Sequence, residues 1–163
     1  MKEVAAEAQD DQLTSAQRQA LMDEYNELAK EIDFVAKNTE YDGTELIDGT
    51  FGTKSFVIDG VSVDQTVSVE LGNLTLEGLQ IGGYTDAQGN IVVASKLDAP
   101  ADAEDAVTRL EAALATLEGE RSNQLAKIER FDFTIAHMER MITINEESVA
   151  SINDFDEASE MAK

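Results

Sequence analysis

The fold is decided by the segment Val107–Ile152, which reads VTRLEAALATLEGERSNQLAKIERFDFTIAHMERMITINEESVASI. Mostly apolar residues recur in it at alternating spacings of three and four, the repeat of a helix that packs along its length in a coiled coil or bundle. We call these positions the seam: Val107, Leu110, Leu114, Leu117, Arg121, Gln124, Ile128, Phe131, Ile135, Met138, Ile142, Asn145, Val149 and Ile152. At 1.5 Å per residue the segment forms a rod of about 70 Å. We therefore expect a scaffold helix to which the rest of the chain attaches.

The charge of the chain excludes several classes of partner. The chain has 163 residues, enough for one domain, with 34 acidic and 12 basic residues and a net charge of −22. Nucleic acid and anionic membranes bind proteins whose Lys and Arg neutralise phosphates, so neither is an expected partner. Cysteine is absent, which rules out disulfides and thiolate metal sites. Neither a signal peptide nor a membrane-spanning segment is visible in the sequence.

A second, shorter seam lies upstream, after a polar break at residues 10–12. Thr14 or Ser15 is placed to cap a helix there. The seam positions of this helix are Leu21, Tyr25, Leu28, Ile32 and Val35. We therefore expect a helix at about residues 14–38 that packs along the first half of the long helix. Replacing Leu114 or Leu117 by Ala would then lower the free energy of unfolding by about 2–5 kcal/mol.

Between the two helices the periodicity changes to that of β-strands. Residues 55–58, 61–71 and 91–93 are typical of strands, and Asp59-Gly60 between the first two is typical of a hairpin turn. Pro100 then suits the start of the long helix, with Asp102 as its cap. The predicted fold is α+β and mainly α, a rod-like bundle of long helices. Its helical core domain comprises residues 1–43 and 98–163, and a β-hairpin region, residues 44–97, is inserted between the helices and caps one end.

No arrangement of residues is typical of an active site. His137 is the only histidine, which excludes a two-histidine relay, and we interpret it as a helix-surface residue. The acidic turn at residues 42–45 lacks the spacing of a calcium-binding loop. Asn73-Leu74-Thr75 fits the N-glycosylation sequon, a pattern short enough to arise by chance. We therefore predict a structural protein, without catalytic residues, cofactor or metal.

Several stretches of the sequence resemble bacterial flagellin, the subunit of the flagellar filament. Residues 2–5, KEVA, are similar to a stretch near the end of the family's first core helix. Residues 31–43, EIDFVAKNTEYDG, are similar to its second core helix and the turn that follows. Residues 120–131, ERSNQLAKIERF, resemble the signature of its returning helix, and shorter matches continue in order to residue 156. Phe34 departs from the pattern, because the family usually has arginine there.

The resemblance implies an extracellular subunit of the flagellar filament, secreted by the flagellar export apparatus without a cleaved signal peptide. Its partners would be other flagellin subunits, flagellar assembly chaperones and the toll-like receptor that recognises flagellin. The family's receptor-binding leucine and glutamate align with Val4 and Glu24, while its arginine would precede Met1, so we expect weak receptor activation or none. The chain resembles a flagellin inner core without the terminal polymerisation segments. A hook–filament junction protein and a generic acidic coiled-coil interaction module remain alternatives.

The second half of the long seam is expected to lack a partner within this chain. The shorter helix covers only about half of the rod, and in flagellin the first core helix packs along the rest. The residues left without a partner are Ile128, Phe131, Ile135, Met138, Ile142, Val149 and Ile152. We expect this stripe to fray or to pair with a second copy, antiparallel about a twofold axis with Asn145 biasing the register. The chain would then be a monomer or a weak homodimer.

Overall fold

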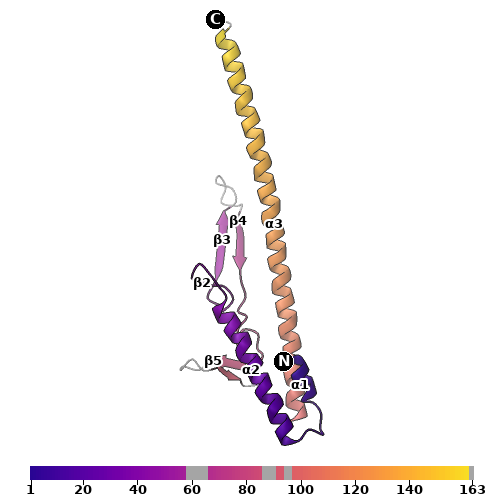
Figure 1. The fold of residues 1–163 in the computed structure, drawn as a ribbon. Coiled ribbons are helices and arrows are strands. Elements are labelled where there is room, and N and C mark those ends of the chain that lie inside the picture. Colours follow the sequence, from indigo (N-terminus) through magenta and orange to yellow (C-terminus); the bar gives the residue numbers. More distant parts are fainter. Residues whose placement is uncertain (58–65, 86–90, 94–96, 162–163) are drawn as a thin grey trace.

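The structure is a computed structural model, and it describes residues 1–57, 66–85, 91–93 and 97–161. Its main element is α3 (Pro100–Met161), a single helix of 62 residues that runs from one end of the molecule to the other (Figure 1). The shorter helices α1 (Lys2–Glu7) and α2 (Ser15–Asn38) lie beside its N-terminal part. The predicted mainly helical α+β fold is therefore confirmed.

Helix α2 begins with a capping box at the position that the sequence indicates. The Thr14 hydroxyl oxygen accepts a hydrogen bond from the Gln17 amide at 3.3 Å, and the Gln17 side-chain oxygen accepts one from the Thr14 amide at 2.9 Å. Two amides at the start of the helix, which have no partner within the helix, are thereby satisfied. From this cap α2 runs in the same direction as α3, whereas α1 runs opposite to both (Figure 1).

The hydrophobic core lies at the N-terminal end of α3. Helix α1 contacts both α2 and α3, and residues of the loop 71–82 share one core cluster with residues of the two longer helices. In this loop the Leu76 amide donates a hydrogen bond to Asp33 Oδ1 of α2 at 3.4 Å, and Gly72 adjoins Glu120 of α3. Helix α2 therefore packs on α3 through α1 and the loop, which corrects the expected direct packing of the two helices. The core residues are Val4, Ala5, Ala8, Tyr25, Ala29, Leu76, Leu79, Ile81, Leu97, Ala103, Ala106, Leu110 and Ala113.

The core-facing surface of α3 is rotated from the predicted seam. Leu110 is buried, and Val107 and Leu117 pack against the core. Leu114, in contrast, is 47% exposed, and Ala113 beside it is buried instead. The prediction that Leu114 lies in the core is therefore wrong. The small side chain of Ala113 allows α1 and the loop to approach α3 closely, so Ala113, and not Leu114, lies in the contact.

The buried face of α2 is also displaced from its predicted seam by one residue, but towards the C-terminus, whereas the displacement on α3 is towards the N-terminus. Tyr25 is fully buried, and Leu21 and Ile32 pack against the core. Leu28 and Val35 are 37% and 50% exposed, and the prediction places them wrongly. Their C-terminal neighbours are buried in their place, at Ala29 and Ala36.

The described part of the β region consists of three antiparallel strand pairs that do not join into one sheet. The pairs are β1 (Glu40–Tyr41) with β2 (Thr44–Glu45), β3 (Thr53–Val57) with β4 (Thr66–Glu70), and β5 (Gly83–Thr85) with β6 (Ile91–Val93). Asp42 and Gly43, with φ of 50° and 71°, connect the first pair in the two-residue turn that favours an Asp-Gly sequence. The predicted turn at Asp59-Gly60 lies outside the described residues.

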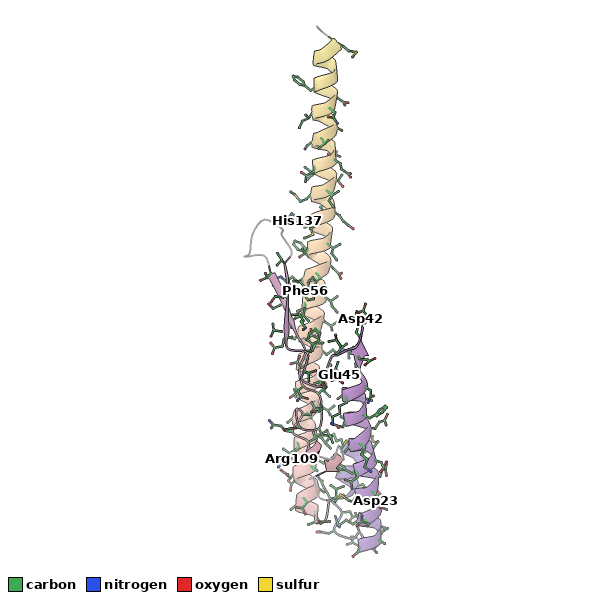
Figure 2. All side chains as sticks on the ribbon, turned by 90° about the vertical axis from the view of Figure 1, so that its left-hand side faces the viewer. Asp23, Asp42, Glu45, Phe56, Arg109 and His137 are labelled. Carbon is green, nitrogen blue, oxygen red and sulfur yellow. The ribbon has the colours of Figure 1, made fainter. Side chains whose placement is uncertain are left out.

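The pair of β3 and β4 lies along the middle of α3, beyond the end of α2 (Figure 1). Gln124 Nε2 and Lys127 Nζ donate hydrogen bonds to the Glu70 carbonyl oxygen at 2.8 and 3.3 Å. The Phe56 ring meets the Phe131 ring edge to face, with 5.9 Å between their centroids, and Figure 2 shows Phe56 on the side of the rod. This strand pair therefore braces the rod from the side, which corrects the expectation that the hairpins cap one end.

Salt is expected to raise the melting temperature of this chain. The described residues form four ion pairs, Lys2–Glu111, Lys30–Glu27, Lys37–Asp33 and Arg109–Asp105. Three of these four pairs are exposed and contribute about 0–1 kcal/mol each, while Asp33 of the fourth is buried. Repulsion within a chain of net charge −22 should therefore dominate, and salt should screen it. Calorimetric scans from low salt to about 0.5 M NaCl test this prediction. A melting temperature that falls with salt would show that attractive pairs dominate.

Candidate functional site

The second half of α3 presents an apolar surface that no other described element covers (Figure 1). Its seam residues, which we call the free seam, are Ile135, Met138, Ile142, Asn145, Val149 and Ile152. Exposure of the apolar ones ranges from 38% at Met138 to 67% at Ile152. A shallow groove of about 470 Å³ lies on this surface, lined by Ile142, Asn145, Glu146, Val149, Ala150 and Asn153. The arrangement suits contact with another helix, since apolar knobs alternate with a groove.

Two residues at the start of the unpartnered stripe have different surroundings. Phe131 is half-buried under Phe56, so the expectation that it lacks a partner in this chain is corrected. Ile128, one turn earlier, is 53% exposed. Fraying of the free seam, or its pairing with a second copy, stays a prediction.

The structure does not offer both predicted receptor residues to a partner. Val4 is 8% exposed and belongs to the core cluster with Tyr25 and Leu110, so its side chain is not available as a contact. This burial corrects the assignment of Val4, and its cause is that α1 contacts both longer helices. Glu24 is exposed on α2, and its part in receptor binding stays a prediction.

The described residues include no group of three or more His, Asp or Glu side chains placed to hold a metal ion. His137 is exposed on α3, where the sequence places it (Figure 2). The Asn73 side-chain oxygen accepts hydrogen bonds from the Thr75 amide at 3.0 Å and the Thr75 hydroxyl at 2.7 Å, so the sequon forms a turn. None of the helices in the described part of the chain combines the length and the apolar content that a membrane span requires.

Two neighbouring carboxyl groups after β1–β2 differ in acidity. A hydrogen bond to Asp48, together with the negative charge of Asp48, raises the pKa of Glu45 above its ordinary value. The Thr50 amide, which donates to Asp48 Oδ1 at 2.9 Å, lowers the pKa of Asp48. Glu45 therefore stabilises the fold at pH below its unfolded pKa and loses this contribution as pH rises through its folded pKa. Asp48 stabilises the fold above its unfolded pKa and loses the contribution as pH falls.

Removing the Asp48 charge should therefore return Glu45 towards ordinary acidity. We expect carboxyl NMR titration to show Glu45 losing its proton at higher pH than Asp48 in the parent chain. In Asp48→Asn the pKa of Glu45 should fall, because its negatively charged neighbour is gone. An unchanged Glu45 titration in this variant would contradict the assigned cause.

The sequence analysis missed a second exposed row on the free half of α3. Phe133, Ile144 and Phe155 are 73%, 54% and 77% exposed. Successive members are eleven residues apart, and eleven residues make about three helical turns, so all three lie on one face. This eleven-residue spacing is present in the sequence, but the three-and-four spacing of the seam predicts a different face. We call the whole line of exposed residues the outer row: Phe133, His137, Arg140, Ile144, Ser148, Ser151 and Phe155.

Comparison with known proteins shows similarity to flagellar proteins. Residues 1–52 match the family described as the bacterial flagellin N-terminal helical region. Flagellin FljJ of Caulobacter vibrioides is 25% identical over 163 residues, which cover 100% of this chain and 56% of that protein. The chain is therefore similar to flagellins along its whole length. A second flagellar relative, the flagellar filament 30.7 kDa core protein of Treponema maltophilum, is 26% identical over 151 residues, 88% of this chain and 52% of that protein.

The flagellin fold is also seen in a solved structure. Bacillus cereus flagellin matches with a TM-score of 0.63 and 21% identity, over 80% of this chain and 69% of that chain. At this identity the likeness shows the fold alone. The chain spans about half the length of the two curated relatives, 56% and 52%.

Proposed function

We propose that this chain is a flagellin and forms part of the wall of the flagellar filament, outside the cell, where it packs against other flagellin subunits. The observation that carries the proposal is the alignment of the whole chain with a flagellin. The name of the Treponema relative, a filament core protein, supports the same role. A rod with apolar rows along its free half also supports assembly, because covering each such side chain is worth about 1.5–3 kcal/mol.

The named relatives favour a filament subunit over a junction protein or a generic coiled-coil module, since they are a flagellin and a filament core protein. The similarity of the chain to structural proteins also supports the prediction that it is not an enzyme. Export by the flagellar apparatus, flagellar chaperones and receptor recognition at Glu24 remain parts of the proposal. The burial of Val4 supports weak receptor activation.

Antibodies raised against the purified chain test the filament role. On cells of the source organism, immunogold labelling should decorate the flagellar filaments along their length. Filaments sheared from the cells should contain peptides of this sequence in mass spectrometry. Labelling confined to the cell body, with filaments free of these peptides, would contradict the proposal. Pre-absorption of the antibody with purified chain is the control for specificity.

A further inference from the structure

Two Asp-Gly pairs among the described residues lie close together in sequence but have different surroundings. Asp42-Gly43 forms the turn between β1 and β2, and Asp48-Gly49 follows β2. Glycine has no side chain, so its backbone nitrogen is the least hindered of any residue. In a flexible chain this nitrogen attacks the carboxyl group of a preceding aspartate more readily than that of any other residue. The third Asp-Gly pair, residues 59–60, lies outside the described residues.

The surroundings of Asp42-Gly43 leave both reacting groups open. Both residues are exposed, and Figure 2 shows Asp42 beyond the C-terminal end of α2. Among the described residues the Asp42 carboxylate accepts no hydrogen bond and forms no ion pair. No neighbouring atom lies within 4 Å of the position that a Cβ on Gly43 would take. The side chain of Asp42 can therefore turn back on the Gly43 nitrogen without displacing a neighbour.

The hairpin that carries this turn is short enough to open locally. It consists of two residue pairs, Glu40 with Glu45 and Tyr41 with Thr44, and all four residues are exposed. An isolated two-stranded hairpin is marginally stable, and exposed segments with few buried contacts open at low free energy. Asp42 also has φ of 50°, a conformation that few residues other than glycine adopt. Opening releases this conformation and lets the backbone reach the geometry of attack.

Asp48-Gly49 is held in place on both sides of the bond. Asp48 is partly buried, and its Oδ1 accepts hydrogen bonds from the Thr50 amide at 2.9 Å and the Thr50 hydroxyl at 2.8 Å. The Thr50 amide also lowers the pKa of Asp48, which keeps this carboxyl group in its ionised, less reactive form. The Asn73 side chain lies 2.8 Å from the position that a Cβ on Gly49 would take. Both the carboxylate and the glycine are therefore restrained.

We propose that Asp42-Gly43 is a site of isoaspartate formation in the folded chain, and that Asp48-Gly49 is protected. The Gly43 nitrogen attacks Cγ of the protonated Asp42 carboxyl group and gives up its proton, and the carboxyl hydroxyl leaves as water. The new N–Cγ bond closes a cyclic succinimide. Water then adds to one ring carbonyl and breaks one C–N bond. Where the original peptide bond breaks, the chain continues through the Asp42 side chain as isoaspartate. Water is released and taken up again, so no other reactant is needed.

Isoaspartate at Asp42 is expected to loosen the end of α2. It adds a methylene group to the backbone of a two-residue turn, so the pairing of β1 with β2 no longer fits the turn. The same hairpin is closed by the Leu46 amide, which donates to the carbonyl oxygen of Thr39, the C-cap of α2, at 2.9 Å. Hydrogen exchange at Leu46 should therefore be faster in the modified chain. This reaction is a property of the folded chain and does not depend on the proposed filament role.

The purified full chain provides a test with an internal control. The chain is incubated for weeks at mildly acidic pH, at which aspartate isomerises most rapidly, and is then digested with trypsin. Cleavage after Lys37 and Lys54 releases both Asp-Gly pairs in one peptide, residues 38–54. Electron-transfer fragmentation in a mass spectrometer locates isoaspartate within this peptide. We expect isoaspartate at Asp42 to exceed that at Asp48 several-fold.

Three controls separate the effect of the fold from the reactivity of the sequence. The synthetic peptide of residues 38–54, which lacks the fold, should isomerise at both aspartates at similar rates. Asp42→Glu should abolish the reaction at that position, because glutamate must close a larger ring, and should leave Asp48 unchanged. Thr50→Val removes one of the hydrogen bonds to Asp48 and should increase isoaspartate there. Circular dichroism verifies that each variant remains folded.

Two results would overturn the proposal. One is isoaspartate at Asp48 equal to or above that at Asp42 in the folded chain. The other is isomerisation of Asp42 several-fold slower in the folded chain than in the synthetic peptide, which would show that the hairpin protects this turn. The structural consequence is measured on the modified chain after chromatographic enrichment. The amide of Leu46 should exchange faster than in the parent chain, while that of Leu79, which donates to the Thr75 carbonyl oxygen in the core loop, should not change. Unchanged exchange at Leu46 would reject the loosening of the end of α2.

Discussion

Replacing Leu110 by Ala is expected to lower the free energy of unfolding by about 2–5 kcal/mol. Leu110 is 6% exposed, and it lies in the core cluster to which α1, α2, α3 and the loop of residues 71–82 all contribute. Truncation removes the buried side chain and leaves a cavity that the helix backbone cannot collapse to fill. Urea denaturation, followed through the helix signal in far-ultraviolet circular dichroism, measures this change in the free energy of unfolding.

Leu114→Ala is the matched control, on the same helix one turn further on. Leu114 is 47% exposed, so its truncation should lower the free energy of unfolding by less than about 1 kcal/mol. The seam alone predicts a large cost at Leu114, so the pair of variants distinguishes the observed face of α3 from the predicted one. Equal losses at both positions would contradict the rotated face.

Replacing Arg18 by Met is expected to lower the free energy of unfolding by about 1.5–3 kcal/mol, the range for hydrogen bonds to charged groups. Arg18 Nη1 donates to the carbonyl oxygens of Ala8 at 2.6 Å and Leu97 at 3.4 Å, and Nη2 donates to that of Asp10 at 3.0 Å. One side chain of α2 thus holds the C-terminal end of α1 and the residues that precede α3. Met keeps most of the apolar stem, so the variant reports mainly on the lost hydrogen bonds.

Arg121→Met is the control for the loss of one positive charge, because Arg121 is exposed on α3 and forms no ion pair with the described carboxylates. Both variants make the chain more negative by the same amount. We expect Arg121→Met to change the melting temperature little and Arg18→Met to lower it by several degrees. A similar decrease in both would attribute the effect to net charge and not to the Arg18 contacts.

The sequence predicts the helices of this chain better than it predicts their contact faces. The three-and-four spacing predicts α2 and α3, and the cap of α2 is Thr14, one of the two residues that the sequence offers. The spacing fails to identify the buried face because it ranks large apolar residues first. In the structure much of the contact is made by alanines, such as Ala29 and Ala113, because a short helix and a loop pack against the long helices.

The sequence also does not predict where the strand pair β3–β4 packs. The sequences of β3 and β4 are typical of strands, but nothing local indicates that this strand pair lies against α3. The Phe56–Phe131 contact and the hydrogen bonds to Glu70 join residues more than fifty positions apart. The outer row, in contrast, can be predicted from the sequence, because residues eleven apart lie on the same face of any α-helix.

The strand pair β3–β4 gives α3 the mechanics of a cantilever. Its contacts hold the helix as far as Phe131, and no described element covers the roughly 40 Å of helix beyond Thr134. The deflection of such a beam under a load at its tip grows with the cube of the projecting length. The bending moment is greatest at the last clamp, where Phe56 meets Phe131. Release of the strand pair would move the clamp back towards Glu120 and lengthen the lever by about 15–20 Å. The position of one aromatic contact thus sets the stiffness of the projecting arm.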